Sequence, residues 1–135
     1  MKGCNSVLEG NVAIQILRAV TQHVNYVKMV RSCLAKNSEE PHCCDHSSCQ
    51  FGQWYENDGN ELIRDMDVPE ATALWTEIGQ HHEAFHDTSI AAVNARRTDA
   101  IRARQMETAM LQRSTLLVNR LLALDGIVNQ KSMVA

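Results

Sequence analysis

Apolar side chains in this chain recur at alternating steps of four and three residues, the spacing that places them on one face of an α-helix. The clearest case follows Pro69, where the spacing joins Ala71, Trp75, Ile78, His82, Phe85, Ser89 and Ala92. Glycines and prolines are few, and no segment shows the apolar–polar alternation that is typical of a half-buried strand. We therefore expect an all-α fold.

The first long helix is expected from about Ser6 to Lys36. A histidine lies within its apolar stripe, which runs through Ile16, Val20, His23, Val27, Val30 and Leu34. Residues 37–48 come next, and they contain a proline and many turn-forming residues. We expect this segment to be a loop.

Two short helical pieces are expected after the loop. The first carries Cys49–Tyr55, with Ser47 or Ser48 as its N-cap. Asparagine, aspartate and glycine cluster at residues 57–60, which predicts that this helix ends there. A second short piece would then span residues 61–67.

Two more long helices are expected in the rest of the chain. Pro69 suits the first turn of one, which should end at a break near residues 96–98. The other carries two neighbouring apolar stripes, one of Met110, Leu117, Leu121, Leu124 and Val128 and one of Leu111, Val118 and Leu122. Residues 1–135 are thus predicted to form a single domain, an antiparallel four-helix bundle with a short additional helix. The wide apolar face of the last helix leaves room for a homodimer contact.

Charge and hydropathy exclude several classes of function. Thirteen basic and sixteen acidic residues give a net charge of -3 without a long basic block, so nucleic acid is not an expected partner. The apolar runs are short and the first residues lack the apolar core of a signal peptide, so we expect a cytoplasmic protein without membrane insertion. In that compartment five cysteines are better explained as ligands, redox-active groups or buried thiols than as disulfides.

Four residues supply the nitrogen and sulfur donors that a closed zinc site needs: His23, Cys49, His82 and His86. The i, i+4 spacing of His82 and His86 places both rings on one side of the same helix. One thiolate with three imidazoles suits zinc better than magnesium or calcium. A set of four protein ligands leaves no open position for catalysis, so we expect a structural or sensory site and no enzyme.

The neighbours of these residues have simpler interpretations. Phe51, Trp54 and Tyr55 are expected to be core packing, and Gly52 is expected to permit a close helix approach. His81 is five residues from His86 and is expected to lie outside the ligand set. A peripheral second metal site is conceivable in the loop, although its composition favours a solvated segment; its donors would be His42, Cys43, Cys44 and His46.

The motifs resemble the chemoreceptor zinc-binding (CZB) domain family. The resemblance rests on His23 followed by Tyr26, on Cys49-Gln50-Phe51-Gly52-Gln53-Trp54, and on His82-Glu83-Ala84-Phe85-His86. It implies a helical bundle that binds zinc through three histidines and one cysteine, as a regulatory module of bacterial chemoreceptors or diguanylate cyclases or as a separate protein. It also implies sensing of zinc, or of oxidants such as hypochlorous acid through the ligating cysteine.

Two other functions stay open at the level of the sequence. A hemerythrin-like di-iron bundle or another metal-binding bundle would also use a His-x-x-x-His pair. A helical dimerisation adaptor would not depend on a metal at all, and its histidines would be incidental.

Overall fold

The computed structural model describes residues 2–36 and 45–134, with side chains over residues 12–36 and 45–130. Five α-helices and one π-helical turn make up this part of the chain, and no strand occurs in it. The elements are α1 (Lys2–Lys36), α2 (Gln50–Trp54), the π turn (Tyr55–Gly59), α3 (Asn60–Met66), α4 (Pro69–Ala95) and α5 (Ala100–Val134). The expected all-α fold is confirmed.

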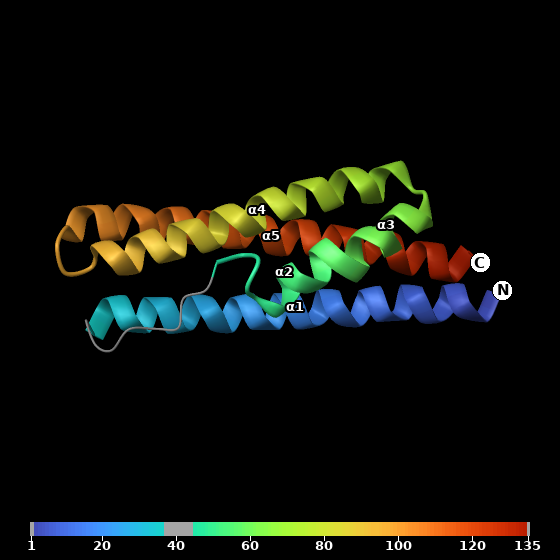
Figure 1. The fold of residues 1–135 in the computed structure, drawn as a ribbon, viewed down its shortest axis with the longest axis horizontal. Coiled ribbons are helices and arrows are strands. Elements are labelled where there is room, and N and C mark those ends of the chain that lie inside the picture. Colours follow the sequence, from blue (N-terminus) through green and yellow to red (C-terminus); the bar gives the residue numbers. More distant parts are fainter. Residues whose placement is uncertain (1, 37–44, 135) are drawn as a thin grey trace.

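The three long helices α1, α4 and α5 lie lengthwise along the molecule, as Figure 1 shows. The shorter run α2–α3 lies beside the half of α1 that is nearer the N-terminus, and the first and last described residues are at the same end of the bundle (Figure 1). Residues 96–99 join α4 to α5 in a tight turn, where the break near residues 96–98 was predicted. None of the described helices is both long and apolar enough to cross a membrane.

Residues 37–44 of the expected loop lie outside the described residues. The helix that begins at Gln50 does not end at residues 57–60, and this part of the prediction is wrong. The chain stays helical from Gln50 to Met66 and widens into a π turn at Tyr55–Gly59. The backbone N–H of Asn60 bonds to the carbonyl of Tyr55 and not to that of Glu56, which would be its partner in an α-helix. The side-chain amide of Asn60 donates to the carbonyl of Glu56 instead, at 3.2 Å. Asparagine, a residue type that favours helix ends, therefore provides a hydrogen-bond donor to a carbonyl of the widened turn.

The predicted serine N-cap of α2 is also wrong, because the cap is Cys49. Its Sγ accepts a hydrogen bond from the backbone N–H of Gly52 at 3.3 Å. Ser47 and Ser48 instead donate to the carboxylate of Asp45, from the hydroxyl at 3.0 Å and from the backbone N–H at 2.9 Å. The serines thus fix the turn that precedes the helix, and the sulfur takes the place of a capping oxygen.

The corner between α3 and α4 forms as the sequence suggests. Asp67 ends α3 with φ at 54°, in the left-handed region, and Pro69 starts α4. A left-handed residue at the helix C-terminus followed closely by proline stops one helix and lets the next begin at an angle.

Two apolar clusters form the core. The larger one joins α1, α2, α3, α4 and α5 through residues such as Ile16, Phe51, Trp75 and Leu121. The smaller one contains Val30, Phe85, Val93 and Met110. The predicted stripe of α4 is confirmed, since all seven of its members are buried. Of the two stripes predicted on α5, the one from Met110 to Val128 is buried, whereas Leu111 and Val118 are half-buried and Leu122 is exposed. Three buried histidines lie on α1 and α4 between most members of the two clusters: His23, His82 and His86.

Candidate metal centre

The four predicted donors come together inside the bundle. The ligand atoms of His23, Cys49, His82 and His86 all lie within 4.8 Å of one another. One comes from α1, one from the start of α2 and two from α4. The three histidines are 1–3% exposed, and Cys49 is half-buried. In the described part of the chain, this is the single cluster of three or more potential metal ligands.

His23 is oriented by its own helix. Its Nδ1 lies 2.6 Å from the backbone oxygen of Ala19, one turn earlier in α1. A carbonyl oxygen only accepts, so Nδ1 carries the proton and Nε2 keeps its lone pair. Hydrogen bonds of this kind fix the tautomer of metal-binding histidines. The spacing of four residues is the signal by which this contact could have been foreseen.

Cys49 places its sulfur atom, a potential metal ligand, beside α4. Its Sγ lies 3.2 Å from Nε2 of His82, and the N–H of Gly52 points at the same sulfur atom. A hydrogen-bond donor at the start of a helix favours the negatively charged thiolate, which is the form that binds metal. The capping role of Cys49 therefore also prepares it as a ligand.

Aromatic rings enclose the cluster. Phe51 lies edge-on to His82 with ring centres 5.0 Å apart, and Phe85 lies edge-on to His23 at 5.4 Å. Tyr26 packs against His86 at 5.2 Å. The expected packing role is confirmed for Phe51, and Trp54 and Tyr55 are half-buried against the same core. These rings limit the access of water on the sides of the cluster that they cover.

Burial keeps two of the histidines neutral. Desolvation lowers the pKa of His23 from 6.5 to about 4, partly opposed by the bond to Ala19 and reinforced by His86. Desolvation, with the neighbouring imidazoles His23, His86 and His46, lowers the pKa of His82 to about 2. Neutral imidazole is the form that coordinates a metal ion, so the site is ready to bind at neutral pH.

The donor set fits a tetrahedral zinc ion. Bonds of about 2.0–2.1 Å to nitrogen and 2.3 Å to sulfur place tetrahedral donors about 3.3–3.6 Å apart. The separation of 3.2 Å between Cys49 and His82 is close to this range, and the widest separation of 4.8 Å requires a small side-chain movement. Three imidazoles and one thiolate without a carboxylate are typical of closed zinc sites.

Several other predicted residues lie outside the cluster. His81 is half-buried beside Arg113, whose Nη1 lies 3.1 Å from its Nδ1, in agreement with its expected exclusion. His46 lies near the site, with its ring centre 6.2 Å from that of His82, a position that was not predicted from the sequence. The other members of the conceivable second site, His42, Cys43 and Cys44, lie outside the described residues.

Gly52 permits a close approach, and its nearest neighbour is a turn. A methyl group at this position would overlap the backbone carbonyl of His46 and come within 3.3 Å of Cε1 of His82. The turn at residues 45–48 is therefore the tightest contact, and α4 approaches the same position through His82. The absent side chain lets this turn pack directly onto α2 beside the cluster.

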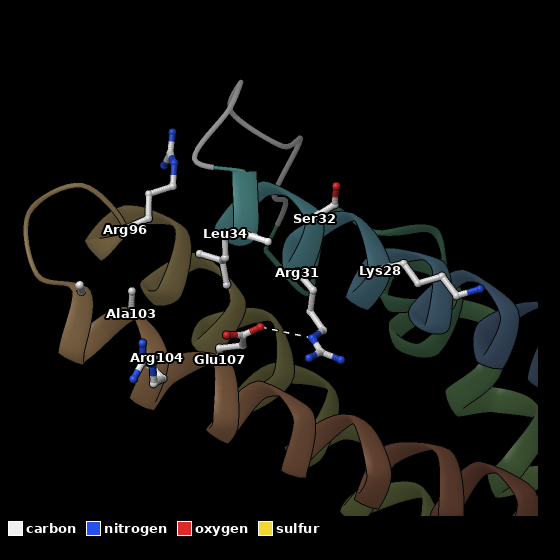
Figure 2. Close-up of a pocket in the computed structure, with 10 residues that line it drawn as sticks. Lys28, Arg31, Ser32, Leu34, Arg96, Ala103, Arg104 and Glu107 are labelled. Atoms are coloured by element: carbon white, nitrogen blue, oxygen red, sulfur yellow. Dashed lines mark hydrogen bonds and ion pairs between the residues drawn. The ribbon is translucent and has the colours of Figure 1, made fainter.

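A separate cleft lies toward the end of the bundle opposite the two termini, where α1 ends and α5 begins. Its volume is about 550 Å³, and Arg31 pairs there with Glu107 at 3.3 Å (Figure 2). In Figure 2 the side chains of Lys28, Arg96 and Arg104 point in different directions and do not meet over the cleft. The cleft shares no residue with the histidine and cysteine cluster.

The profile of one protein family matches the part of the chain that holds the cluster. The match to the chemoreceptor zinc-binding domain covers residues 23–93, more than half of the 135 residues. It begins at His23 and includes the other three donors. We found no match among curated proteins or solved structures. On the strength of the profile, the chain belongs to the chemoreceptor zinc-binding domain family.

Proposed function

We propose that this domain is a non-enzymatic regulatory module that holds one Zn²⁺ ion through His23, Cys49, His82 and His86. The observation that carries the proposal is the convergence of four donor atoms within 4.8 Å, from three separate helical segments. Membership of a zinc-binding family supports zinc as the metal. The neutral state of the buried imidazoles and the thiolate-favouring contact at Cys49 support it further.

Zinc, when bound, would supply a coordination link between helices that otherwise meet through packing and a few side-chain hydrogen bonds. The protein's own residues prepare this link. Ala19 sets the tautomer of His23, Gly52 directs an N–H at the sulfur of Cys49, and Phe51 and Phe85 exclude water. Occupancy would thereby alter how α1, α2 and α4 press on one another within the antiparallel four-helix bundle that we propose for the whole of residues 1–135.

We propose that this change is passed to a bacterial signalling protein, either attached or separate, such as a chemoreceptor or a diguanylate cyclase in the cytoplasm. Cys49 offers a second input, because oxidation of the single sulfur would remove one of the four donors. Hypochlorous acid is the oxidant to test. Zinc release in step with loss of the Cys49 thiol is the expected result, and retention of zinc after thiol loss contradicts the oxidant input.

We further propose that the domain forms a homodimer through the outer face of α1. Ile14, Leu17 and Val24 lie on one stripe of this helix and are 51%, 59% and 41% exposed. Leu122, which belongs to the second apolar stripe predicted on the last helix, is 50% exposed. A two-fold contact buries such a stripe against its own copy. Leu17→Glu should convert dimer to monomer in analytical ultracentrifugation, and an unchanged mass contradicts this interface.

The other two functions are less well supported by the site. Di-iron bundles take carboxylate ligands from several helices, whereas the cluster found in the described residues contains none. A metal-independent adaptor would gain nothing from three imidazoles and a thiol placed together in a dry interior, since buried polar groups are costly without partners.

The test is the metal content of protein purified without added zinc. Wild type should carry about one zinc per chain by elemental analysis, and His23→Ala, Cys49→Ala and His82→Ala should each lose most of it. His81→Ala is the matched control, because His81 is adjacent to a proposed ligand in sequence but faces Arg113. Iron in the wild type, or no metal at neutral pH, contradicts the proposal. Cobalt substitution should add a sulfur charge-transfer band that Cys49→Ala abolishes.

A further inference from the structure

A small cleft leads from the surface to the buried cluster. Its volume is about 240 Å³, and its lining includes His82, which is only 2% exposed. The cleft lies between the turn that holds His46 and the exposed face of α4 around Glu83. It is large enough for several water molecules or a partly hydrated metal ion.

The charge of the cleft suits a cation. Glu56 and Glu83 are exposed and line it, and no lysine or arginine is among its lining residues. This distinguishes it from the larger cleft of Figure 2, which is lined by Arg31, Arg96 and Arg104. Carboxylates around an opening raise the local concentration of divalent cations.

His46 lines this cleft next to His82. Its ring is perpendicular to that of His82, with centres 6.2 Å apart, and it is half-buried in the wall of the cleft. Asp45 fixes the turn through its bonds to Ser47 and Ser48, and Gly52 leaves room for the carbonyl of His46 to pack against α2. The turn is thus held in place, and it carries His46 beside the donor set without His46 being part of that set.

We propose that this cleft is the path by which zinc enters and leaves the site, and that His46 is a transfer donor on it. The inference rests on the proposed function of zinc binding. The imidazole nitrogen of His46 would bind the ion while the ion loses water, and His46 would then pass the ion to His82. As a fifth donor, His46 would lower the barrier to ligand exchange at zinc. Because His46 is absent from the final set of four, it would change the rates in both directions and not the affinity.

The test is the rate of zinc exchange measured by stopped flow. Release is followed by transfer of zinc to 4-(2-pyridylazo)resorcinol, and uptake by mixing the metal-free protein with Zn²⁺. His46→Ala should slow both by about tenfold, which corresponds to about 1.4 kcal/mol in the barrier, and leave Kd within twofold. His46→Cys, which restores a donor, should recover most of the rate, whereas His46→Gln should not.

Controls separate this path from a general loosening of the turn. His81→Ala should exchange zinc at the wild-type rates, because His81 faces Arg113. Glu56→Gln combined with Glu83→Gln should slow uptake and reduce its dependence on ionic strength. Wild-type rates in His46→Ala, or a loss of affinity with unchanged uptake, overturn the transfer role and leave zinc binding intact. A wild-type protein without zinc overturns both proposals.

Discussion

The indole N–H of Trp75 donates a hydrogen bond of 2.6 Å to the side-chain oxygen of Asn60. The same asparagine amide donates to the carbonyl of Glu56 that the π turn leaves out. Asn60 therefore ties the widened turn to α4, and Tyr55 adds to the link by stacking on Trp75 with ring centres 4.2 Å apart. The widened turn therefore connects the helical segment that carries Cys49 to the helix that carries His82, two of the proposed zinc ligands.

Replacing Asn60 with alanine should lower the free energy of unfolding by about 1–2 kcal/mol, because the indole N–H of Trp75 loses its acceptor. Asn57→Ala is the control, since the Asn57 amide donates to the carbonyl of Gln53 within the same helical run. Its effect should stay below about 0.5 kcal/mol. Urea denaturation measures both, and equal effects of the two variants would contradict the joint.

Two glycine substitutions should shift stability in opposite directions. A methyl group at Gly79 would overlap the phenol of Tyr55, whereas one at Gly126 in α5 meets nothing within 4 Å. Gly79→Ala should cost about 1–3 kcal/mol through overpacking. Gly126→Ala should add about 0.5–1 kcal/mol, because alanine loses less backbone freedom in an exposed helix. Thermal unfolding followed by circular dichroism distinguishes the two signs.

Replacing Asp67 with glycine should stabilise the domain. It is the one non-glycine residue with a positive φ, 54°, in the described part of the chain. Glycine adopts this conformation without the steric cost that an L-residue carries, so Asp67→Gly should add about 0.5–1 kcal/mol to the free energy of unfolding. Asp67→Val is the opposite control, since a β-branched side chain is strained there. A loss of stability on Asp67→Gly would show that the aspartate makes contacts that outweigh the strain.

The metal-free domain should lose stability in acid because of its buried histidines. The folded pKa values of His23 and His82, about 4 and about 2, lie below the ordinary 6.5 of the unfolded chain. The unfolded state therefore binds more protons once the pH falls below 6.5, and the stability that is present above this pH is lost as the pH drops toward about 4 for His23 and about 2 for His82. Each histidine contributes a slope of about 1.4 kcal/mol per pH unit.

Denaturation in the presence of a chelator between pH 7.5 and 5 measures this slope. Near pH 5.5 the two histidines together should cost about 2–3 kcal/mol relative to neutral pH. The double variant His23→Leu, His82→Leu should show a much flatter profile, because it removes both groups. A profile as steep as that of the wild type would mean that other groups cause the acid sensitivity.

Zinc should stabilise the domain in proportion to its occupancy. Free zinc at 100 times Kd adds about 2.7 kcal/mol, which should raise Tm by about 10 °C for a chain of this size. Chelation should reverse the shift, and Cys49→Ala should remove most of it. His81→Ala should keep the full shift, so that loss of a ligand is distinguished from a nonspecific effect of zinc on the surface.

Much of the fold follows from the sequence because helical periodicity is a local signal. The α4 stripe from Ala71 to Ala92 and the donors on it could be placed by counting residues. The π turn could not, since it depends on the side chain of Asn60 bonding to a skipped carbonyl and to Trp75 on another helix. The cap at Cys49 was missed because cysteine is an uncommon cap, and serines stood at the adjacent positions.

The proximity of His46 to the cluster was equally inaccessible from spacing. It results from the packing of a turn onto Gly52, and the sequence shows only a loop histidine near a glycine. Donors carried on long helices are thus easier to predict from the sequence than the turn residues that lie beside them, because tertiary contacts determine where a turn packs.

The position of the cluster along α1 has a mechanical consequence. His23 lies 21 residues from Lys2 in a helix that runs from Lys2 to Lys36, a separation of about 30 Å. With zinc bound as we propose, the cluster would act as a pivot partway along this helix. A rotation of α1 by about 5° about this pivot would carry its N-terminal end through about 3 Å, estimated from that length. A small rearrangement of the four donor atoms would in this way displace the N-terminal end of α1, beside which the C-terminus of α5 also lies (Figure 1).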